Sequence, residues 1–234
     1  MTINDEVRTS DAVWAGAAGY TRARLQVYDF FIYGFNSPVA WKCPGEELLE
    51  NYNRHVSGNH LDVGVGTGYL LDRCRFPTAK PRVFLMDLNP DALQVTAQRL
   101  HRFQPQTLRR NVLDPIRFDG EPFDSIGMNY LMHCVPGSIP EKAVMFDHLS
   151  ALLKPGGVIF GSTVLSEGVD KGIVARAIMD RFNKKGIFSN TRDAASDLTR
   201  ALEERFDDVS VRVVGCVGLF SARKRTCAGT ESPA

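Results

Sequence analysis

From His60 onward, short apolar runs alternate with longer stretches in which apolar residues recur at helical spacing. Short apolar runs are typical of strands buried in a parallel sheet, and the intervening stretches are long enough for connecting helices. The pattern therefore predicts an α/β fold, a doubly wound sheet of seven strands with helices on both faces. The expected strands are Leu61–Val65, Arg82–Asp87, Thr107–Arg110, Phe123–Asn129, Gly157–Val164, Val209–Val214 and Cys216–Ala222.

Five stretches between these runs have helical spacing, and two of them begin at a proline, which suits the first turn of a helix. The last two expected strands are separated by Gly215 alone, whereas a parallel crossover needs roughly a dozen residues. They are therefore expected to form a C-terminal antiparallel hairpin. The expected helices are Tyr69–Arg73, Pro90–Phe103, Pro140–Leu153, Gly172–Phe182 and Arg192–Phe206.

Aromatic side chains are dense before the first expected strand. We interpret residues 1–57 as an N-terminal helical cap, residues 58–225 as the core domain, and residues 226–234, which are small and polar, as a disordered tail. The aromatic residues of the cap are Trp14, Tyr20, Tyr28, Phe30, Phe31, Tyr33, Phe35, Trp41 and Tyr52.

Length and charge narrow the range of partners. The chain has 234 residues, of which 44% are hydrophobic, so it is long enough to bury a full core. Lys and Arg number 28 against 27 Asp and Glu, which leaves a net charge of +1. This balance creates no basic field, so neither nucleic acid nor a membrane is expected as a partner.

The cysteines and the N-terminus indicate a reducing compartment. The five cysteines are widely spaced without a CxxC pair, so we expect free thiols and no metal site. No basic segment followed by an apolar one opens the chain, and no apolar stretch approaches the roughly 20 residues of a membrane helix. A cytoplasmic protein is expected.

The strongest motif is the segment HLDVGVGTGY at residues 60–69, an apolar strand that enters a glycine loop and then a helix. Glycines allow a ligand to approach the backbone, and the helix start offers free N–H groups. A dinucleotide fingerprint starting at Gly64 would need its third glycine where Tyr69 stands. The Asp62 carboxylate would repel a pyrophosphate but attract a cation, so the expected ligand is S-adenosylmethionine, which carries an ammonium and a sulfonium but no phosphate. The alternative is a tight turn without a ligand.

Asp87 ends the second expected strand, about 20 residues beyond the glycine loop, where α/β nucleotide folds place a carboxylate on ribose hydroxyls. We expect it to accept hydrogen bonds from both hydroxyls. The alternative is a cap for the helix that begins near Pro90, a role for which Asn89 competes.

From residue 60 to residue 222 the chain resembles class I S-adenosylmethionine-dependent methyltransferases, including their Rossmann-like order of elements and closing hairpin. The segment LKPGG at residues 153–157 resembles the turn before their fifth strand. The resemblance implies that the first motif, Asp62, Gly64, Gly66 and Gly68, holds the methionine part of the cofactor.

The resemblance assigns further cofactor contacts. It implies that Asp87 binds ribose, that Leu88 lies against adenine, and that Asn129 ends the strand beneath the cofactor. Asn111 and Val112 stand where the family usually has an acidic residue and a small neighbour that bind adenine. The Asn111 side-chain carbonyl can still accept from an exocyclic amine, and the Val112 backbone N–H can donate.

The acceptor is expected beyond the carboxyl ends of the strands, near the switch between the first and fourth. His133 follows the fourth strand and is the candidate catalytic base for a hydroxyl acceptor, although a structural histidine is the alternative. Tyr28, Tyr33, Trp41 and Tyr130 are candidates for binding the substrate, with packing of the cap on the sheet as the alternative.

These observations predict a methyltransferase that acts on a small-molecule substrate of a natural-product pathway, as a monomer or homodimer. O-methylation is expected first, with N-, C- or S-methylation also open. The rival hypothesis is a protein of this fold that binds the cofactor without methyl transfer, as a pericyclase-like enzyme or a regulatory partner. Tyr69 argues against a nicotinamide dehydrogenase, and the segment NYLM at residues 129–132 lacks the Asn-Pro-Pro-Tyr type of motif of DNA amino-methylating enzymes.

Overall fold

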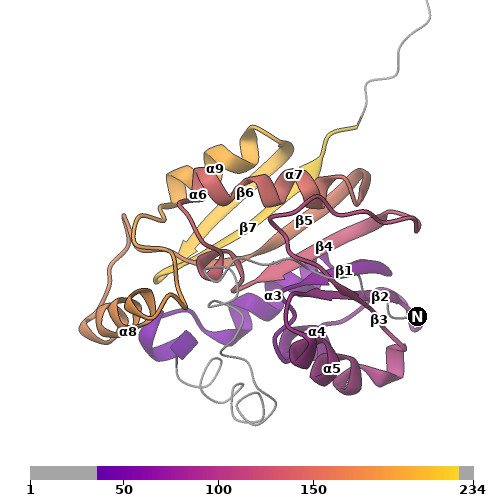
Figure 1. The fold of residues 1–234 in the computed structure, drawn as a ribbon, viewed down its shortest axis with the longest axis horizontal. Coiled ribbons are helices and arrows are strands. Elements are labelled where there is room, and N and C mark those ends of the chain that lie inside the picture. Colours follow the sequence, from indigo (N-terminus) through magenta and orange to yellow (C-terminus); the bar gives the residue numbers. More distant parts are fainter. Residues whose placement is uncertain (1–35, 227–234) are drawn as a thin grey trace, which may run out of the picture.

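Seven strands form one mixed sheet in the order β3-β2-β1-β4-β5-β7-β6, as the computed structural model shows for residues 36–226 (Figure 1). The first five strands along the chain run parallel, and β7 pairs antiparallel with both β5 and β6. The predicted α/β fold and the closing hairpin are therefore confirmed. The strands are β1 (Asn59–Val63), β2 (Arg82–Asp87), β3 (Gln106–Arg109), β4 (Phe123–Asn129), β5 (Leu153–Val164), β6 (Phe206–Val214) and β7 (Val217–Lys224).

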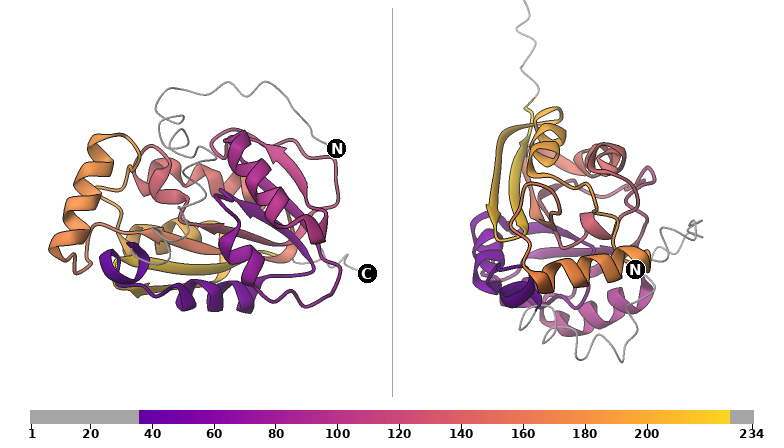
Figure 2. Two further views of the ribbon diagram at one scale, coloured as in Figure 1. Left: turned by 90° about the horizontal axis from the view of Figure 1, so that it is seen from below. Right: turned by 90° about the vertical axis from the view of Figure 1, so that its left-hand side faces the viewer.

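Helices cover both faces of the sheet, as the views from below and from one side show (Figure 2). In Figure 1, α6, α7 and α9 lie above the sheet, and α3, α4 and α5 lie below it. The helices are α3 (Gly45–His55), α4 (Tyr69–Arg73), α5 (Pro90–Arg99), α6 (Ile139–Lys142), α7 (Val144–Ser150), α8 (Ile173–Lys184) and α9 (Ala195–Glu203), with short 3₁₀ turns η2 (His101–Phe103) and η3 (Met132–Cys134).

Each face of the sheet has its own hydrophobic core. One core joins alternate strand residues such as Leu61 and Met86 to Phe146 of α7 and Leu202 of α9. The other joins the intervening strand residues, such as Leu85, to helices α3, α4, α5 and α8. Burial on both faces explains why the strands appear in the sequence as continuous apolar runs.

Several element limits differ from those expected. The predicted helix Pro90–Phe103 ends at Arg99 and continues as η2, and Pro140–Leu153 divides into α6 and α7. Strand β5 begins at Leu153, so the LKPGG segment is its irregular start, where the pairing with β4 shifts register. Gly215 forms the hairpin turn with a left-handed φ of 57°.

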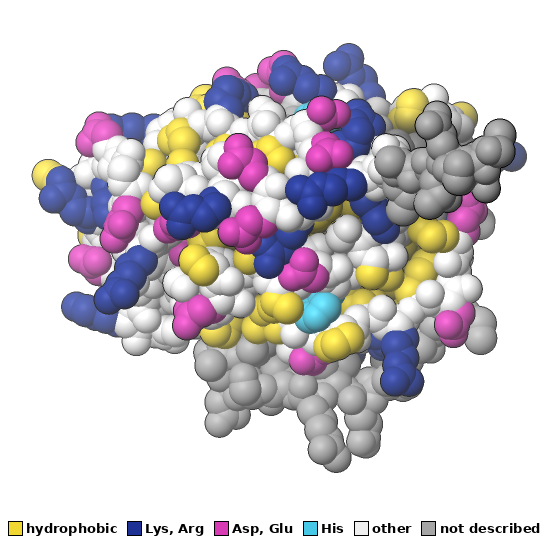
Figure 3. Space-filling model, turned by 90° about the horizontal axis from the view of Figure 1, so that it is seen from above, with side chains coloured by type: hydrophobic (Ala, Val, Ile, Leu, Met, Phe, Trp, Pro, Cys, Tyr) yellow, Lys and Arg dark blue, Asp and Glu magenta, His cyan; other side chains and the backbone are white. Residues whose placement is uncertain are grey.

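The predicted cap falls partly outside the described residues, because residues 1–35 and 227–234 are not among them. The described part contains α3, which packs against the sheet as one of its covering helices, with Leu48 and Tyr52 buried. Among residues 36–226, no helix is long and apolar enough to span a membrane. Acidic and basic side chains are interspersed on the face seen in Figure 3.

Candidate functional site

A cavity opens at the carboxyl ends of the parallel strands. The strands β1, β2 and β4 and the segment after β3 all contribute to its lining, as expected for the switch point of a doubly wound sheet. The predicted site residues found in the lining are Asp62, Gly64, Gly66, Gly68, Asp87, Leu88, Asn111, Val112, Asn129 and Tyr130.

The glycine loop depends on its glycines for two different reasons. Gly66 has a φ of 53°, and a Cβ built on it would meet no atom within 4 Å, because that position faces open space. A Cβ on Gly68 would instead come within 2.6 Å of Thr96 Cγ2. Thr96 is a buried residue of α5, and its Oγ1 donates to the Gly66 carbonyl at 3.0 Å. The loop is thus closely packed against α5 at Gly68 and open to the cavity at Gly66.

Asp62 lies in β1, is only 4% exposed, and lines the cavity. Burial raises the pKa of its carboxyl to about 7, and the nearby Asp87 adds to this shift, whereas a hydrogen bond from Tyr52 opposes it. Tyr52 projects from α3 and donates its hydroxyl to Asp62 Oδ2 at 2.8 Å. A cation in the cavity would stabilise the charge of this carboxylate.

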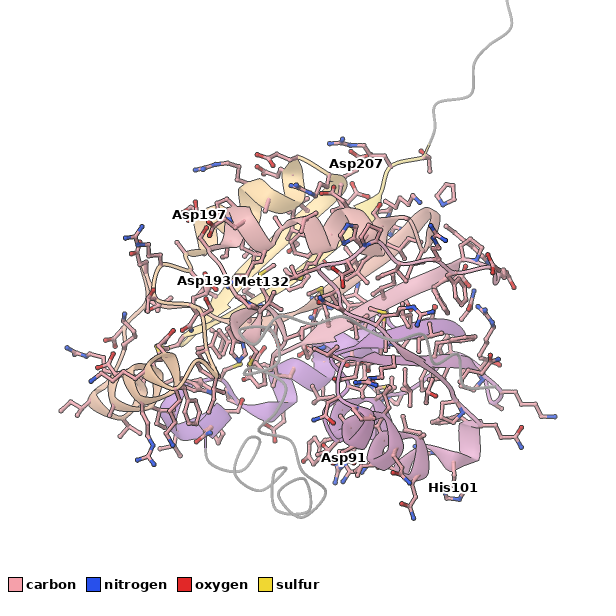
Figure 4. All side chains as sticks on the ribbon, in the orientation of Figure 1. Asp91, His101, Met132, Asp193, Asp197 and Asp207 are labelled. Carbon is pink, nitrogen blue, oxygen red and sulfur yellow. The ribbon has the colours of Figure 1, made fainter. Side chains whose placement is uncertain are left out.

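Asp87 ends β2, at the neighbouring edge of the same cavity. Asn89, not Asp87, caps α5, because the Asn89 side chain accepts from the N–H of Asp91 at 2.8 Å (Asp91 is labelled in Figure 4). Asp87 Oδ1 accepts from the Asn89 N–H at 2.9 Å. Burial raises the pKa of Asp87 to about 6, against the effect of these backbone N–H groups. The cap alternative for Asp87 is therefore wrong.

Asn111 follows β3 and is held by its own loop. Its Oδ1 accepts from the Leu113 N–H at 3.1 Å, and its Nδ2 donates to Asp114 Oδ2 at 3.0 Å. The carbonyl of the neighbouring Val112 accepts a hydrogen bond from His148 Nδ1 of α7 at 3.0 Å. This bond does not involve the Val112 N–H, which is the group predicted to donate to adenine. His148 therefore has a structural role in holding this loop.

His133 lies in η3 and is 3% exposed, outside the cavity lining. Its Nδ1 accepts from the Val164 N–H at 3.2 Å, so the proton of the neutral ring is on Nε2. Burial, with a smaller effect of nearby Lys142, lowers the pKa of the imidazole to about 3. No nitrogen is left to take a proton from an acceptor, so the geometry favours the structural alternative over the predicted general base.

The predicted substrate-binding aromatics separate into three groups. Tyr130 lines the cavity, and its hydroxyl forms a 2.8 Å hydrogen bond with Ser37 Oγ. Trp41 is 2% exposed and packs near Phe188, with ring centroids 6.2 Å apart, outside the cavity lining. Trp41 is therefore a core residue in this structure. Tyr28 and Tyr33 lie outside the described residues.

The cavity also includes residues that sequence reasoning missed. Tyr52 was recognised only as one aromatic of the cap, because nothing local to α3 reveals that it bonds to Asp62. Arg110 was passed over, although it directly precedes the adenine-binding candidate Asn111. The turn at residues 134–136 after η3 was also missed as part of the cavity wall.

Comparisons with known proteins agree with this geometry. A methyltransferase domain family matches residues 61–159. Demethylluteothin O-methyltransferase of Streptomyces thioluteus is 44% identical over 207 residues, which cover 88% of this chain and 90% of that relative. The chain belongs to the class I S-adenosylmethionine-dependent methyltransferases. It is a methyltransferase of the branch that acts on small molecules.

A fungal relative and a solved structure also resemble this methyltransferase. The physcion biosynthesis cluster O-methyltransferase of Aspergillus chevalieri is 37% identical over 211 residues, covering 89% of this chain and 95% of the relative. The solved structure of the DhpI complex with S-adenosylhomocysteine has a TM-score of 0.65 at 16% sequence identity. The match covers 94% of this chain and 100% of the DhpI chain. Because the identity is low, the structural likeness concerns the fold.

The cavity fits S-adenosylmethionine, the cofactor of this family. The open space at Gly66 accommodates a ligand that approaches the backbone. The two cavity carboxylates, Asp62 and Asp87, suit an ammonium and a pair of hydroxyls, whereas both would repel a phosphate.

Proposed function

We propose that this enzyme transfers a methyl group to an ionisable hydroxyl of a small aromatic natural product. The observation that carries the proposal is the pair of cavity carboxylates, Asp62 and Asp87, on either side of the glycine loop. The choice of oxygen is supported by the O-methyltransferase relatives at 44% and 37% identity over nearly the full chain.

The chain's own residues divide the cofactor between them. Asp62 would take the α-ammonium, with Tyr52 holding its carboxylate. The backbone of Gly64, Gly66 and Gly68 would follow the methionine part, and Asp87 would accept from the ribose hydroxyls. Asn111, Val112 and Leu88 would bind adenine. When bound, the cofactor supplies its methyl group to the acceptor oxygen, a C–O bond forming as the C–S bond breaks with its electron pair left on sulfur.

The acceptor hydroxyl must also lose its proton. His133 is unsuited to this task, because its Nδ1 is occupied and its pKa is lowered to about 3. A phenol or enol that ionises in solution near neutral pH needs no protein base, since positioning of donor and acceptor can supply the remaining rate enhancement. This reasoning favours an acidic hydroxyl over a simple alcohol.

The proposal is tested in two steps. Calorimetry with S-adenosylhomocysteine first measures cofactor binding, which we expect near micromolar, about −8 kcal/mol. Turnover is then measured with labelled S-adenosylmethionine and demethylluteothin, the acceptor named for the Streptomyces relative. An amine panel serves as the comparison, because a 40% identical relative from Penicillium aethiopicum is named an N-methyltransferase. Cofactor binding with methylation of amines alone would contradict the O-methylation proposal, and binding without any transfer would support the non-methylating rival.

A further inference from the structure

Asn129 carries an unsatisfied hydrogen-bond donor at the edge of the cavity. It is the last residue of β4, and it lines the cavity. Its Oδ1 accepts a hydrogen bond from Ser162 Oγ at 2.9 Å. Its Nδ2 atom is buried and has no partner among residues 36–226. A buried amide donor without a hydrogen-bond partner is unfavourable, so we expect a bound ligand to accept a hydrogen bond from Asn129 Nδ2.

Ser162 determines which way the amide faces. This serine is fully buried in β5, which runs beside β4 and pairs Ser162 with Asn129 (Figure 1). Ser162 Oγ accepts from the Tyr130 N–H at 3.3 Å, so its own proton is available for Asn129 Oδ1. The carbonyl oxygen of the Asn129 amide is thereby bonded to β5, and its NH₂ group faces the cavity.

The residue after Asn129 has a strained backbone, yet it keeps its hydrogen bond to β5. Tyr130 has a φ of 52°, a left-handed conformation that is unfavourable for a residue other than glycine. The Tyr130 N–H still donates to the Ser162 carbonyl at 2.9 Å, which continues the pairing of β4 with β5 past the end of the strand. Strain of this kind persists where surrounding contacts hold it, and it is frequent at functional sites.

Asn129, also predicted as a cofactor contact, lies in the sheet between the other predicted cofactor-binding residues and β5. Asp62, Asp87 and Asn111 belong to β1, β2 and the segment after β3, and the sheet order places these three strands on one side of β4. The Asn129 amide is bonded to β5, on the other side. Its N–H side therefore faces away from Ser162, into the cavity that the cofactor and the acceptor share.

We propose that the Asn129 amide donates a hydrogen bond to the acceptor oxygen that receives the methyl group, and that Ser162 is a positioning residue for this amide. The inference rests on the proposed function. A donor at this position stabilises the oxyanion form of the bound hydroxyl, whose proton goes to solvent, and it leaves oxygen lone pairs for the methyl group. It also selects against neutral amines, because the hydrogen bond would occupy the single nitrogen lone pair that must attack the methyl group.

The test measures binding of demethylluteothin to the complex of the protein with S-adenosylhomocysteine, in which no methyl group can be transferred. Asn129→Asp keeps the size of the side chain but replaces the donor by a carboxylate oxygen. We expect it to weaken demethylluteothin binding at pH 8 by about tenfold to a hundredfold, the loss of one charge-assisted hydrogen bond. The affinity for S-adenosylhomocysteine alone should stay within about threefold, because the inference assigns the Asn129 donor to the acceptor and the variant leaves Asp62 and Asp87 untouched.

A double-mutant cycle tests the role of Ser162. Ser162→Ala should weaken demethylluteothin binding by about threefold to tenfold in the wild-type background and have no further effect in Asn129→Ala. A merely structural serine would lower affinity equally in both backgrounds. Ser125→Ala is the matched control, because Ser125 is an equally buried strand serine, bonded to His60 at 2.8 Å and outside the cavity lining. It should leave both affinities unchanged.

Three results would overturn the inference. The first is a folded Asn129→Asp variant, as checked by thermal unfolding, that binds demethylluteothin like the wild type. The second is the same variant losing affinity for S-adenosylhomocysteine and demethylluteothin by the same factor, which would assign the donor to the cofactor. Wild-type protein that binds S-adenosylhomocysteine but not demethylluteothin would contradict the proposed acceptor class, and with it the partner assigned to Asn129.

Discussion

Asp62 and Asp87 are the residues whose protonation should control cofactor binding. Without a ligand, burial raises the pKa of Asp62 to about 7 and that of Asp87 to about 6. The cofactor's ammonium and hydroxyls favour the ionised forms, so binding lowers both pKa values. The affinity for S-adenosylhomocysteine should therefore be full above pH 7 and decrease as the pH falls through 7 and then 6.

Calorimetry from pH 5 to pH 8.5 measures this dependence. Asp62→Asn should bind about tenfold to a hundredfold more weakly at pH 8 and lose the step near pH 7. Tyr52→Phe removes the hydrogen bond that lowers the Asp62 pKa, so its step should move to higher pH. An affinity that does not change with pH in the wild type would contradict the assignment of both carboxylates.

Gly66→Val should abolish binding of S-adenosylhomocysteine while the protein stays folded. The new side chain would occupy the open space that the cavity offers at this position, and the left-handed backbone adds strain of about 1–2 kcal/mol. Gly168→Val is the control, because Gly168 also has a positive φ and open space but lies outside the cavity lining. It should lose similar stability in urea unfolding and keep its affinity. Equal binding by the two variants would mean that the loop is only a turn.

His133→Asn tests the structural role of His133. The asparagine carbonyl can replace Nδ1 as the acceptor for the Val164 N–H, so we expect kcat to fall less than about tenfold. The pH–rate profile with demethylluteothin should keep its shape, because a group whose pKa is lowered to about 3 does not titrate near neutrality. A folded variant with a loss of about a hundredfold or more would restore His133 as the general base.

At the scale of elements, a buried ion pair joins α6 to the loop before α9. Lys142 Nζ donates to Asp193 Oδ2 at 2.8 Å and to the Ser189 carbonyl at 2.8 Å, and both charged side chains are at most 1% exposed. Figure 4 shows Asp193 toward the middle of the molecule and Asp207 at its rim. The Ser189 N–H donates to the His133 carbonyl at 2.7 Å, so the same loop also supports η3.

Lys142→Met should lower the free energy of unfolding by about 3–5 kcal/mol, because it leaves the Asp193 carboxyl buried without its cation. The double variant Lys142→Met, Asp193→Leu should lose distinctly less, since no unpaired charge remains. Urea unfolding at pH 7.5 measures both. A double variant that is at least as unstable as the single variant would contradict this prediction. It would mean that apolar packing cannot replace the stabilisation of the loop by the Lys142–Asp193 ion pair.

For the whole molecule, two sets of buried groups should oppose each other in the pH dependence of stability. Burial lowers the pKa values of His60 and His133 to about 3, so their contribution is full above pH 6.5 and is lost as the pH falls toward 3. Burial raises the pKa values of Asp62, Asp87 and Asp193, so acidification from about pH 7 to pH 3.8 gains stability through them. Each fully titrating group changes the free energy of unfolding by about 1.4 kcal/mol per pH unit.

The unliganded enzyme should therefore gain up to about 1.4 kcal/mol of stability per pH unit as the pH falls from 6 to 4, because three aspartates outnumber two histidines. It should lose stability below pH 4, where only the histidines still act. Saturating S-adenosylhomocysteine keeps Asp62 and Asp87 ionised, so the stabilisation by the ligand should shrink as the pH falls. Urea unfolding with and without the ligand, from pH 3 to pH 8, measures both curves. A ligand-induced stabilisation that grows on acidification would contradict this account.

The sequence by itself determined the features that depend on neighbouring residues. Two-sided burial makes each strand a local apolar run, so β2 and β4 were located to the residue. The single glycine between the last two predicted strands left room only for a hairpin, and Gly215 and Cys216 form the turn between β6 and β7. The glycine loop and Asp87 were recognisable because the backbone conformation and the end of a strand are local properties.

Tertiary structure alone decided which side chains meet across the fold. Tyr52 reaches Asp62 from a covering helix, Ser162 orients Asn129 from a neighbouring strand, and Lys142 meets Asp193 across 51 positions of sequence. The same holds for His133, whose place after β4 suggested a base but whose Nδ1 is occupied by the N–H of Val164. Such contacts depend on how strands and helices pack, and no periodicity or motif within a segment encodes them.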